Sequence, residues 1–206
     1  MEARTEILRR IRAATSRALP HPGPHPAPTL PGSREAFAAA LATAGGELEG
    51  PYGPEVLSDA VTARARDWAA GGRAVALPTA GALLGPGPWE LPAENAAPAG
   101  FADVALTLAI GWLGVSENGA VAVLGRDAPQ RALLHLAERL ILLVPARRLV
   151  PDLHTAFREL PADALDAHHL TWIAGPSKTA DIEQTLVHGA HGPRAVAVLL
   201  YEEPGA

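Results

Sequence analysis

The sequence predicts an α/β protein with a mostly parallel central sheet and helices on both faces. The runs 104–110, 140–144 and 195–201 are apolar almost throughout, as strands buried on both faces are. These runs alternate with segments of helical periodicity, and that alternation is typical of a parallel sheet. With 206 residues, 48% of them hydrophobic, the chain is long enough to bury a full core.

The first 32 residues differ in composition from the rest. Residues 2–19 place Ile7, Leu8 and Ile11 on one side of a helix and most arginines elsewhere, which is an amphipathic pattern. Residues 20–32 contain six prolines and no hydrophobic pattern, as an extended linker does. We therefore expect 1–32 to be an arm that docks on its own body or on another subunit, and 33–206 to be the α/β domain.

Residues 33–100 predict two helices, a strand and a long loop. One helix starts at Ser33 and ends at Gly45-Gly46, and a second covers 54–70 before Gly71-Gly72, because glycine commonly follows a helix. The strand 73–77 comes next. The Pro/Gly-rich loop 85–100 is long enough to be a lid, and its Trp89 either anchors the loop or covers a cleft.

Residues 104–201 complete the alternation. Asn118-Gly119 between the strands 104–110 and 120–124 is typical of a tight antiparallel hairpin. The segments that follow are predicted, in order, as helix 129–137, strand 140–144, helix 150–160, strand 170–174, helix 179–188 and strand 195–201.

Composition excludes several functions. A net charge of −5 without a long Lys/Arg cluster argues against a nucleic-acid partner. The chain has no cysteine, so disulfides, thiol nucleophiles and Cys-ligated iron–sulfur clusters are excluded from it, and any such cluster belongs to a partner. The longest uncharged apolar stretch, 104–115, is too short to cross a bilayer, and the N-terminus is charged, so we expect a cytoplasmic protein without a membrane span.

The segment GPSKTADIE, residues 175–183, is the strongest candidate site. After the predicted strand 170–174, Ser177, Lys178 and Thr179 fall where a following helix exposes its first free N–H groups. Such a helix N-terminus beside a lysine attracts phosphate or carboxylate. Pro176 and the absence of the required glycines exclude a Walker A loop. The alternative is that these hydroxyls only cap the helix.

Two other groups are weaker candidates. His191, in HGP, is expected to fix the turn or contact a ligand. Its spacing from His188 is found in some zinc sites, but Gly189 interrupts the helix between them, and no metal site is predicted. Glu117 and Asn118 occupy the predicted hairpin, where they either contact a ligand or form a tight turn with positive φ angles.

The linked motifs GPSKTADIE and LVHGAHGP resemble the C-terminal signature of the lactate utilisation protein C family, whose domain is called LUD. Weaker likeness in GVSENGAVAV and RLILLVPARRLVPDL extends the resemblance over about residues 35–203. The resemblance implies a NagB/RpiA/CoA-transferase-like fold. It also implies a part in oxidising L-lactate to pyruvate, within a three-component system whose other subunits carry iron–sulfur clusters. This chain would be the cofactor-free subunit, with a small anion held at Lys178 and the adjacent helix N-terminus.

The chain departs from the family pattern in two places. The family usually has Thr/Ser-Gly-Thr/Ser after the hairpin acid, where this chain has Asn118, Gly119 and Ala120. It usually has a histidine at Leu140, while a family arginine is matched by Arg131. If the chemistry needs those groups, this chain has lost it.

Two alternatives stay open. One is a stand-alone enzyme acting on an anionic metabolite, such as a phosphosugar isomerase, a CoA transferase or a folate cyclo-ligase, with Glu117 as the best candidate base. The other is a structural scaffold that binds no ligand at Lys178. No Ser-His-Asp triad, redox cysteine pair or nucleotide-binding fingerprint can be assembled from the sequence.

Overall fold

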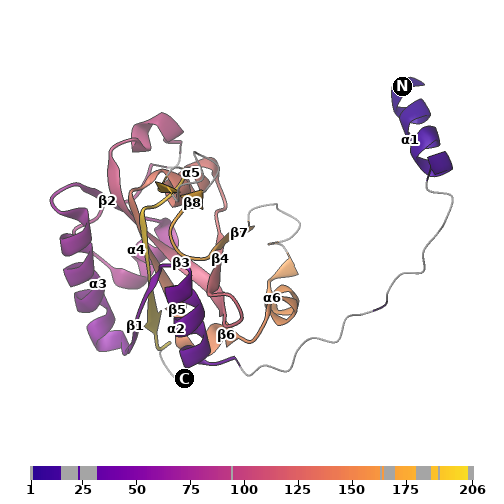
Figure 1. Cartoon of the computed structure of the whole chain (residues 1–206). Coiled ribbons are helices and arrows are strands. Elements are labelled where there is room, and N and C mark those ends of the chain that lie inside the picture. The colour runs from indigo at the N-terminus through magenta and orange to yellow at the C-terminus, as the bar shows by residue number, and fades with distance from the viewer. Residues whose placement is uncertain are drawn as a thin grey trace.

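The computed structural model describes residues 2–14, 23, 32–93, 95–162, 164, 170–179, 187–189 and 191–203. These residues form a mixed α/β domain around an eight-stranded sheet, which confirms the predicted fold class (Figure 1). Its parallel part has the order β1-β10-β5-β3-β2. The bounds of these strands are β1 (Glu47–Tyr52), β10 (Ala195–Tyr201), β5 (Arg139–Pro145), β3 (Val104–Val115) and β2 (Arg73–Ala76).

The sheet changes character along β3, which continues beyond the predicted strand 104–110. Its second half pairs antiparallel with β4 (Ala120–Leu124), and β4 pairs antiparallel with β7 (Leu170–Ile173). The short β6 (Leu149–Val150) runs parallel to the end of β3. A register shift between Gly111 and Leu113 marks the point where β3 pairs with β4 instead of the parallel strands.

Helices cover both faces of the parallel sheet, as predicted. Side chains alternate along the buried strand β5, so that Leu140 and Leu142 pack on one face and Ile141 and Leu143 on the other. The first face is covered by α2 (Arg34–Thr43), α5 (Ala128–Leu136) and the 3₁₀ turn η1 (Pro98–Phe101), and the second by α3 (Pro54–Ala69) and α4 (Pro78–Leu84). A smaller cluster joins α6 (Leu153–Glu159) to the ends of β3 and β4. A 3₁₀ turn, η2 (Ala146–Arg148), follows β5.

Local sequence explains where the helices start. The side chains of Ser33, Asp127 and Asp152 accept hydrogen bonds from N–H groups in the first turns of α2, α5 and α6. Each of these short polar side chains satisfies a backbone donor that the helix itself leaves unpaired. Helices α2 and α5 therefore begin within one residue of their predicted starts, while α6 begins three residues after its predicted start at Val150, which belongs to β6.

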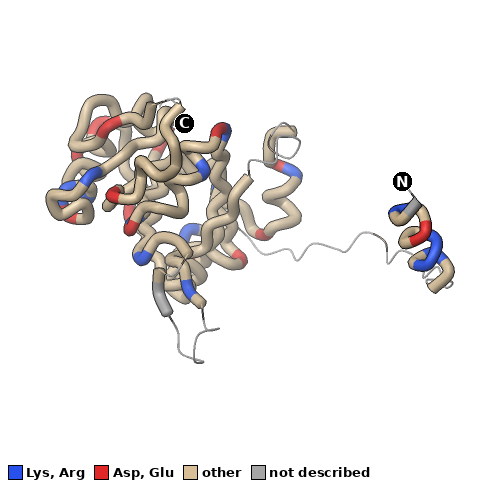
Figure 2. Tube along the Cα trace, turned by 90° about the horizontal axis from the view of Figure 1, so that it is seen from above, with Lys and Arg blue, Asp and Glu red and all other residues tan. Residues whose placement is uncertain are grey.

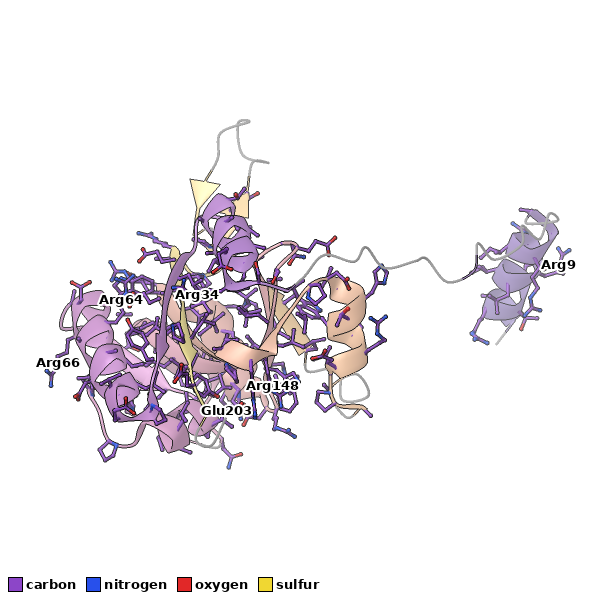
Figure 3. The ribbon with its side chains drawn as sticks, turned by 90° about the horizontal axis from the view of Figure 1, so that it is seen from below. Arg9, Arg34, Arg64, Arg66, Arg148 and Glu203 are labelled. Atoms are coloured by element: carbon purple, nitrogen blue, oxygen red, sulfur yellow. The ribbon has the colours of Figure 1, made fainter. Side chains whose placement is uncertain are left out.

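Strand β1 was missed by the sequence-based prediction, because its segment ELEGPY has no apolar alternation. It forms one edge of the sheet, and its carboxylates Glu47 and Glu49 are ion-paired with Arg64 of α3. Figure 3 shows Arg64 on α3 beside this edge. Arg64 also lies 4.3 Å from the ring centroid of Trp68, so one arginine ties α3 to the edge strand.

The loop after α4 is attached to the opposite edge of the parallel sheet. The backbone of Glu90 is hydrogen-bonded to Ala74 and Ala76 of β2, at 3.0 and 2.9 Å. Trp89 is half-buried and packs against the core under α3 and α4. Of the two predicted roles for Trp89, its position favours the anchoring one.

Helix α1 (Glu2–Ala14) confirms the first part of the predicted N-terminal helix. In Figure 1 it lies apart from the α/β body. Its Ile7 and Ile11 are exposed, and Glu6 pairs with Arg9 and Arg10. Docking of this arm stays a prediction. None of the helices in the described ranges is both long and apolar enough to span a bilayer.

We expect Thr107→Val to raise the free energy of unfolding by about 1 kcal/mol. Thr107 is fully buried beside Leu140, and its hydroxyl has no hydrogen-bond partner among the described residues. Urea denaturation measures the change. Thr107→Ser, which keeps the hydroxyl and loses the methyl group, should instead destabilise by about 1 kcal/mol. Equal losses in both variants would mean that the hydroxyl is paired.

Candidate functional site

The segment predicted to present a helix N-terminus forms a β-ribbon. β8 (Lys178–Thr179) pairs antiparallel with β9 (Val187–His188). The helix predicted over 179–188 is therefore wrong at both ends, and residues 180–186, with Asp181 and Glu183, lie outside the described residues. Thr179 and Val187 are β-branched and face each other across the ribbon, a pairing that favours strands.

Backbone hydrogen bonds explain why Ser177 does not start a helix. The Ser177 N–H donates to the carbonyl of Pro193 at 2.9 Å, and the Gly189 N–H donates to the carbonyl of Ser177 at 2.8 Å. The Ser177 N–H, which was expected to face an anion, is thus already hydrogen-bonded within the chain. These bonds do, however, bring the two sequence motifs together, as a shared site requires.

Ser177 and His191 line one cleft, which we call the signature cleft. It has a volume of about 190 Å³, and His135 of α5 and Trp172 of β7 also line it. An adjoining hollow of about 410 Å³ shares His135 and His191. Arg194 donates its N–H to the carbonyl of Glu138 here, just before β10 and β5 begin. The signature cleft therefore lies at the amino ends of β10 and β5 and just beyond the carboxyl end of β7, the strand that the predicted turn was expected to follow.

Lys178 takes a different position from the one predicted. A Cβ placed on Gly45 would lie 3.0 Å from Lys178 Nζ, so the ammonium group sits just beyond the last turn of α2. A cation at a helix C-terminus interacts favourably with the exposed carbonyl groups. Gly175 packs on the same helix end, with no room for a side chain beside the carbonyl of Ala44. Lys178 is thus exposed near the end of α2, and it is not among the described residues that line the signature cleft.

Glu117 and Asn118 serve the hairpin and α6. Asn118 Oδ1 accepts a hydrogen bond from the Ala120 N–H at 3.0 Å, and Glu117 Oε2 accepts one from the Leu153 N–H at 3.4 Å, at the start of α6. Both side chains are exposed, and neither lines the signature cleft. The turn covers residues 116–119, and the positive φ predicted for Asn118 is found only at Gly119. Of the two predictions for this pair, these contacts favour the turn.

The structure also shows where Arg131 and Leu140 lie, the two positions compared with an arginine and a histidine of the family pattern. Arg131 Nη1 donates to the carbonyl of Gly125 at 3.3 Å, next to the start of α5. Leu140 is fully buried in the core under α5, beside Thr107, whose hydroxyl has no hydrogen-bond partner within the described ranges. An apolar side chain thus stands where the family pattern has an imidazole, and no polar group at position 140 reaches a cleft.

The structure contains a second pocket, which we call the carboxyl-edge pocket. The sequence-based prediction did not find it. It has a volume of about 270 Å³ and lies where β2 ends and β3 changes partners. Ligands of α/β proteins commonly bind outside the carboxyl ends of parallel strands. The lining residues are Pro78, Thr79, Ile110, Trp112, Leu124, Arg126 and Gln130. They come from three stretches of the sequence, 78–79, 110–112 and 124–130, so no single local motif marks them.

Charged residues do not gather into a metal-binding group. Across the part of the chain that the structure describes, no three His, Asp or Glu residues are placed to hold a metal ion. Figure 2 shows Lys and Arg interspersed with Asp and Glu along the backbone of the body. What the clefts offer is therefore hydroxyl, imidazole, guanidinium and amide groups, which bind ligands through hydrogen bonds and charge.

Comparison with known proteins gives the following matches. The family model described as the LUD domain matches residues 93–201. Proteins named "Lactate utilization protein C" match from Halalkalibacterium halodurans (34% identity over 50% of this chain and 45% of that protein), Geobacillus kaustophilus (32%, 42% and 38%) and Deinococcus radiodurans (32%, 42% and 41%). The aligned stretches span less than half the length of each of these relatives.

The fold also matches a solved structure. The crystal structure of a DUF162 family protein from Deinococcus radiodurans superposes with a TM-score of 0.60 at 18% sequence identity. The match covers 81% of this chain and 94% of that one. At this identity the likeness supports the fold alone.

We expect Gly119→Ala to destabilise the protein more than Gly71→Ala, by at least about 1 kcal/mol. Both glycines have positive φ, of 70° and 82°, where an alanine is strained by roughly 1–2 kcal/mol. A Cβ at Gly119 would in addition lie 2.5 Å from the Leu41 nitrogen of α2, while one at Gly71 meets nothing within 4 Å. Thermal or urea unfolding measures both. Equal losses of stability in the two variants would show that Gly119 is not in close contact with α2.

We expect stability to fall in acid partly through Asp152. The hydrogen bond from the Thr155 N–H is the main cause that lowers the pKa of this carboxyl below its ordinary 3.8. A lowered folded pKa stabilises the protein above the unfolded value, and that contribution is lost as the pH falls below 3.8. Asp152→Asn should therefore unfold more easily than wild type near about pH 6, with the difference shrinking near about pH 3. A difference independent of pH would contradict this.

Proposed function

The chain belongs to the LUD domain family, and from that premise we propose that it acts in lactate utilisation, as the cofactor-free component of an iron–sulfur system that oxidises L-lactate to pyruvate. The observation that carries the proposal is the family match over residues 93–201, together with relatives named for lactate utilisation. That stretch includes Glu117 and Asn118, the residues of the carboxyl-edge pocket from β3 onward, and the signature cleft.

The absence of cysteine supports the proposal that the iron–sulfur clusters belong to other subunits. Iron–sulfur clusters are held mainly by cysteine thiolates, and these 206 residues contain none. In the proposed system the clusters and the electron transfer belong to partner subunits in the cytoplasm. This chain binds a small organic anion and contacts those partners.

The signature cleft is the proposed place for a small anion. Ser177 offers a hydroxyl donor, and His135 and His191 offer ring N–H groups, beside the half-buried ring of Trp172. A volume of about 190 Å³ suits a small carboxylate. Lys178 lies near the end of α2 and outside the described lining of this cleft, and residues 178–179 form β8 instead of the predicted helix N-terminus, so neither is part of the proposed site.

The stand-alone enzyme needs a base in a cleft, and its candidate was Glu117. That carboxylate is exposed at the start of α6 and lines neither the signature cleft nor the carboxyl-edge pocket. Among the residues that the structure describes, no specific contact favours this alternative, so the lactate-utilisation component is the function proposed.

Deletion of the gene from its own organism should abolish growth on L-lactate as sole carbon source and leave growth on succinate unchanged. We expect complementation by Ser177→Ala or His191→Gln to lower the rate of lactate consumption about tenfold or more, because each removes a donor to the anion. His154→Gln, an exposed histidine on α6, is the matched control and should restore wild-type consumption.

Gentle affinity purification of the tagged chain from lactate-grown cells is the second arm of this experiment. Stoichiometric partners that contain iron are expected in the eluate. Normal growth of the deletion strain on lactate would overturn the proposed function. An iron-free eluate would overturn the assignment of partners, and full activity of both cleft variants would overturn the assignment of the cleft.

A further inference from the structure

Two glycines of the motif LVHGAHGP make room for two side chains that can hold an anion. A Cβ placed on Gly192 would lie 3.2 Å from the Cβ of Ser177 and 3.7 Å from its hydroxyl oxygen. A Cβ on Gly189, whose φ is 74°, would overlap the Cγ of Arg194 and lie 3.3 Å from its Nε. Because glycine leaves this space free, the loop holds the side chains of Ser177 and Arg194 against its backbone.

Backbone hydrogen bonds keep these two residues close to each other. The Gly189 N–H donates to the carbonyl of Ser177 at 2.8 Å, while the stem of Arg194 crosses the same glycine. The Arg194 N–H donates to the carbonyl of Glu138 at 2.7 Å, which ties the arginine to the start of β5. The hydroxyl of Ser177 and the guanidinium group of Arg194 are therefore carried by neighbouring, hydrogen-bonded backbone.

The two side chains line different hollows. Ser177 is among the described residues that line the signature cleft, and Arg194 is among those that line the adjoining hollow. The two linings have His135, His191 and Gly192 in common, so the two imidazoles lie where the hollows meet. Both histidines and Arg194 are exposed, which leaves them accessible to a ligand. A ligand that contacts both Ser177 and Arg194 therefore presents one anionic group in each hollow.

We propose that the signature cleft and the adjoining hollow form one site for a short dicarboxylate. One carboxylate accepts hydrogen bonds from Ser177 and His191 in the signature cleft, and the other accepts them from the guanidinium group of Arg194. Arginine suits this second position because its planar fork of N–H groups binds both oxygens of a carboxylate. The inference rests on the assignment of the signature cleft in the proposed function, and it adds the second charged group of the ligand.

Lactate would occupy only part of this site. It has one carboxylate and a methyl group, while the adjoining hollow alone has a volume of about 410 Å³. Glu138 also lines that hollow, and its carboxylate repels an anion. Binding of the second carboxylate therefore depends on its hydrogen bonds to Arg194 and not on a general excess of positive charge.

Isothermal titration of the purified full chain tests the site with L-malate, (S)-2-hydroxybutanoate, L-lactate and inorganic phosphate. L-malate differs from (S)-2-hydroxybutanoate only in having a carboxylate where the other has a methyl group. We expect L-malate to bind at least about tenfold more tightly than either monocarboxylate, because the second carboxylate adds charge-assisted hydrogen bonds.

Side-chain variants test each end of the site. Arg194→Gln should weaken the binding of L-malate about tenfold or more, and that of (S)-2-hydroxybutanoate far less. Arg66→Gln, at an exposed arginine of α3 labelled in Figure 3, is the control for the loss of a positive charge and should change neither affinity. Glu138→Gln should tighten L-malate about threefold, because it removes a repelling charge. Ser177→Ala should weaken both hydroxy acids, since both place a carboxylate in the signature cleft.

Gly189→Ala tests the position of Arg194 without changing any charge. The added Cβ displaces the arginine stem, so the preference for L-malate over (S)-2-hydroxybutanoate should fall about as far as in Arg194→Gln. Gly71→Ala is the matched control, because Gly71 also has a positive φ, of 82°, and a Cβ there meets nothing within 4 Å. Far-UV circular dichroism confirms that each variant is folded.

Equal affinities for L-malate and (S)-2-hydroxybutanoate, or an unchanged affinity for L-malate in Arg194→Gln, would overturn the inference. Tighter binding of phosphate than of L-malate would also overturn it, since the site would then belong to a phosphorylated ligand. Unchanged affinities in Ser177→Ala would overturn both the inference and the assignment of the signature cleft. Growth on lactate is measured separately, so a normal deletion strain would overturn the proposed role in lactate utilisation while the titrations still decide the dicarboxylate site.

Discussion

Strand β3 pairs with four other strands, and the architecture of the domain depends on those pairings. Its first half lies between β2 and β5 in the parallel sheet, and its second half pairs with β4 and β6. The register shift between Gly111 and Leu113 separates the two halves. Ile110 and Trp112 flank that shift and both line the carboxyl-edge pocket. The change of partners along β3 and the carboxyl-edge pocket thus lie at the same place in the sheet.

Much of the fold could be predicted from local sequence, because local chemistry determines it. The runs 140–144 and 195–201 are apolar on every residue, and only a strand covered on both faces explains that. Ser33 and the glycines after α2 and α3 marked helix ends in the same way. Strand β1 could not be found, since its segment is polar and its partner β10 is about 150 residues away in the chain. Only the tertiary pairing makes that segment a strand.

In the candidate site, too, the features that local sequence determines could be predicted, and those that depend on tertiary contacts could not. Ser177 and His191 were predicted from two neighbouring motifs, and a short backbone hydrogen bond between Ser177 and Pro193 brings those motifs together. The helix expected over 179–188 was wrong at both of its ends, because Thr179 and Val187–His188 belong to the paired strands β8 and β9. His135, Trp172 and Arg126 come from segments distant in sequence, and only the fold places them at a cleft. Neither the periodicity nor the composition of the sequence shows which of these distant residues lie together at a cleft.

The two edges of the parallel sheet have a consequence for association. At one edge, Pro51 of β1 has no N–H to donate, the Gly50 carbonyl accepts a bond from Arg34, and Glu47 and Glu49 carry charge. At the other edge, the backbone of Glu90 is already hydrogen-bonded to Ala74 and Ala76 of β2. Unpaired edge strands are the usual starting points of aggregation and of strand exchange between copies. With both of these edges protected, a neighbouring chain is disfavoured from extending the parallel part of the sheet.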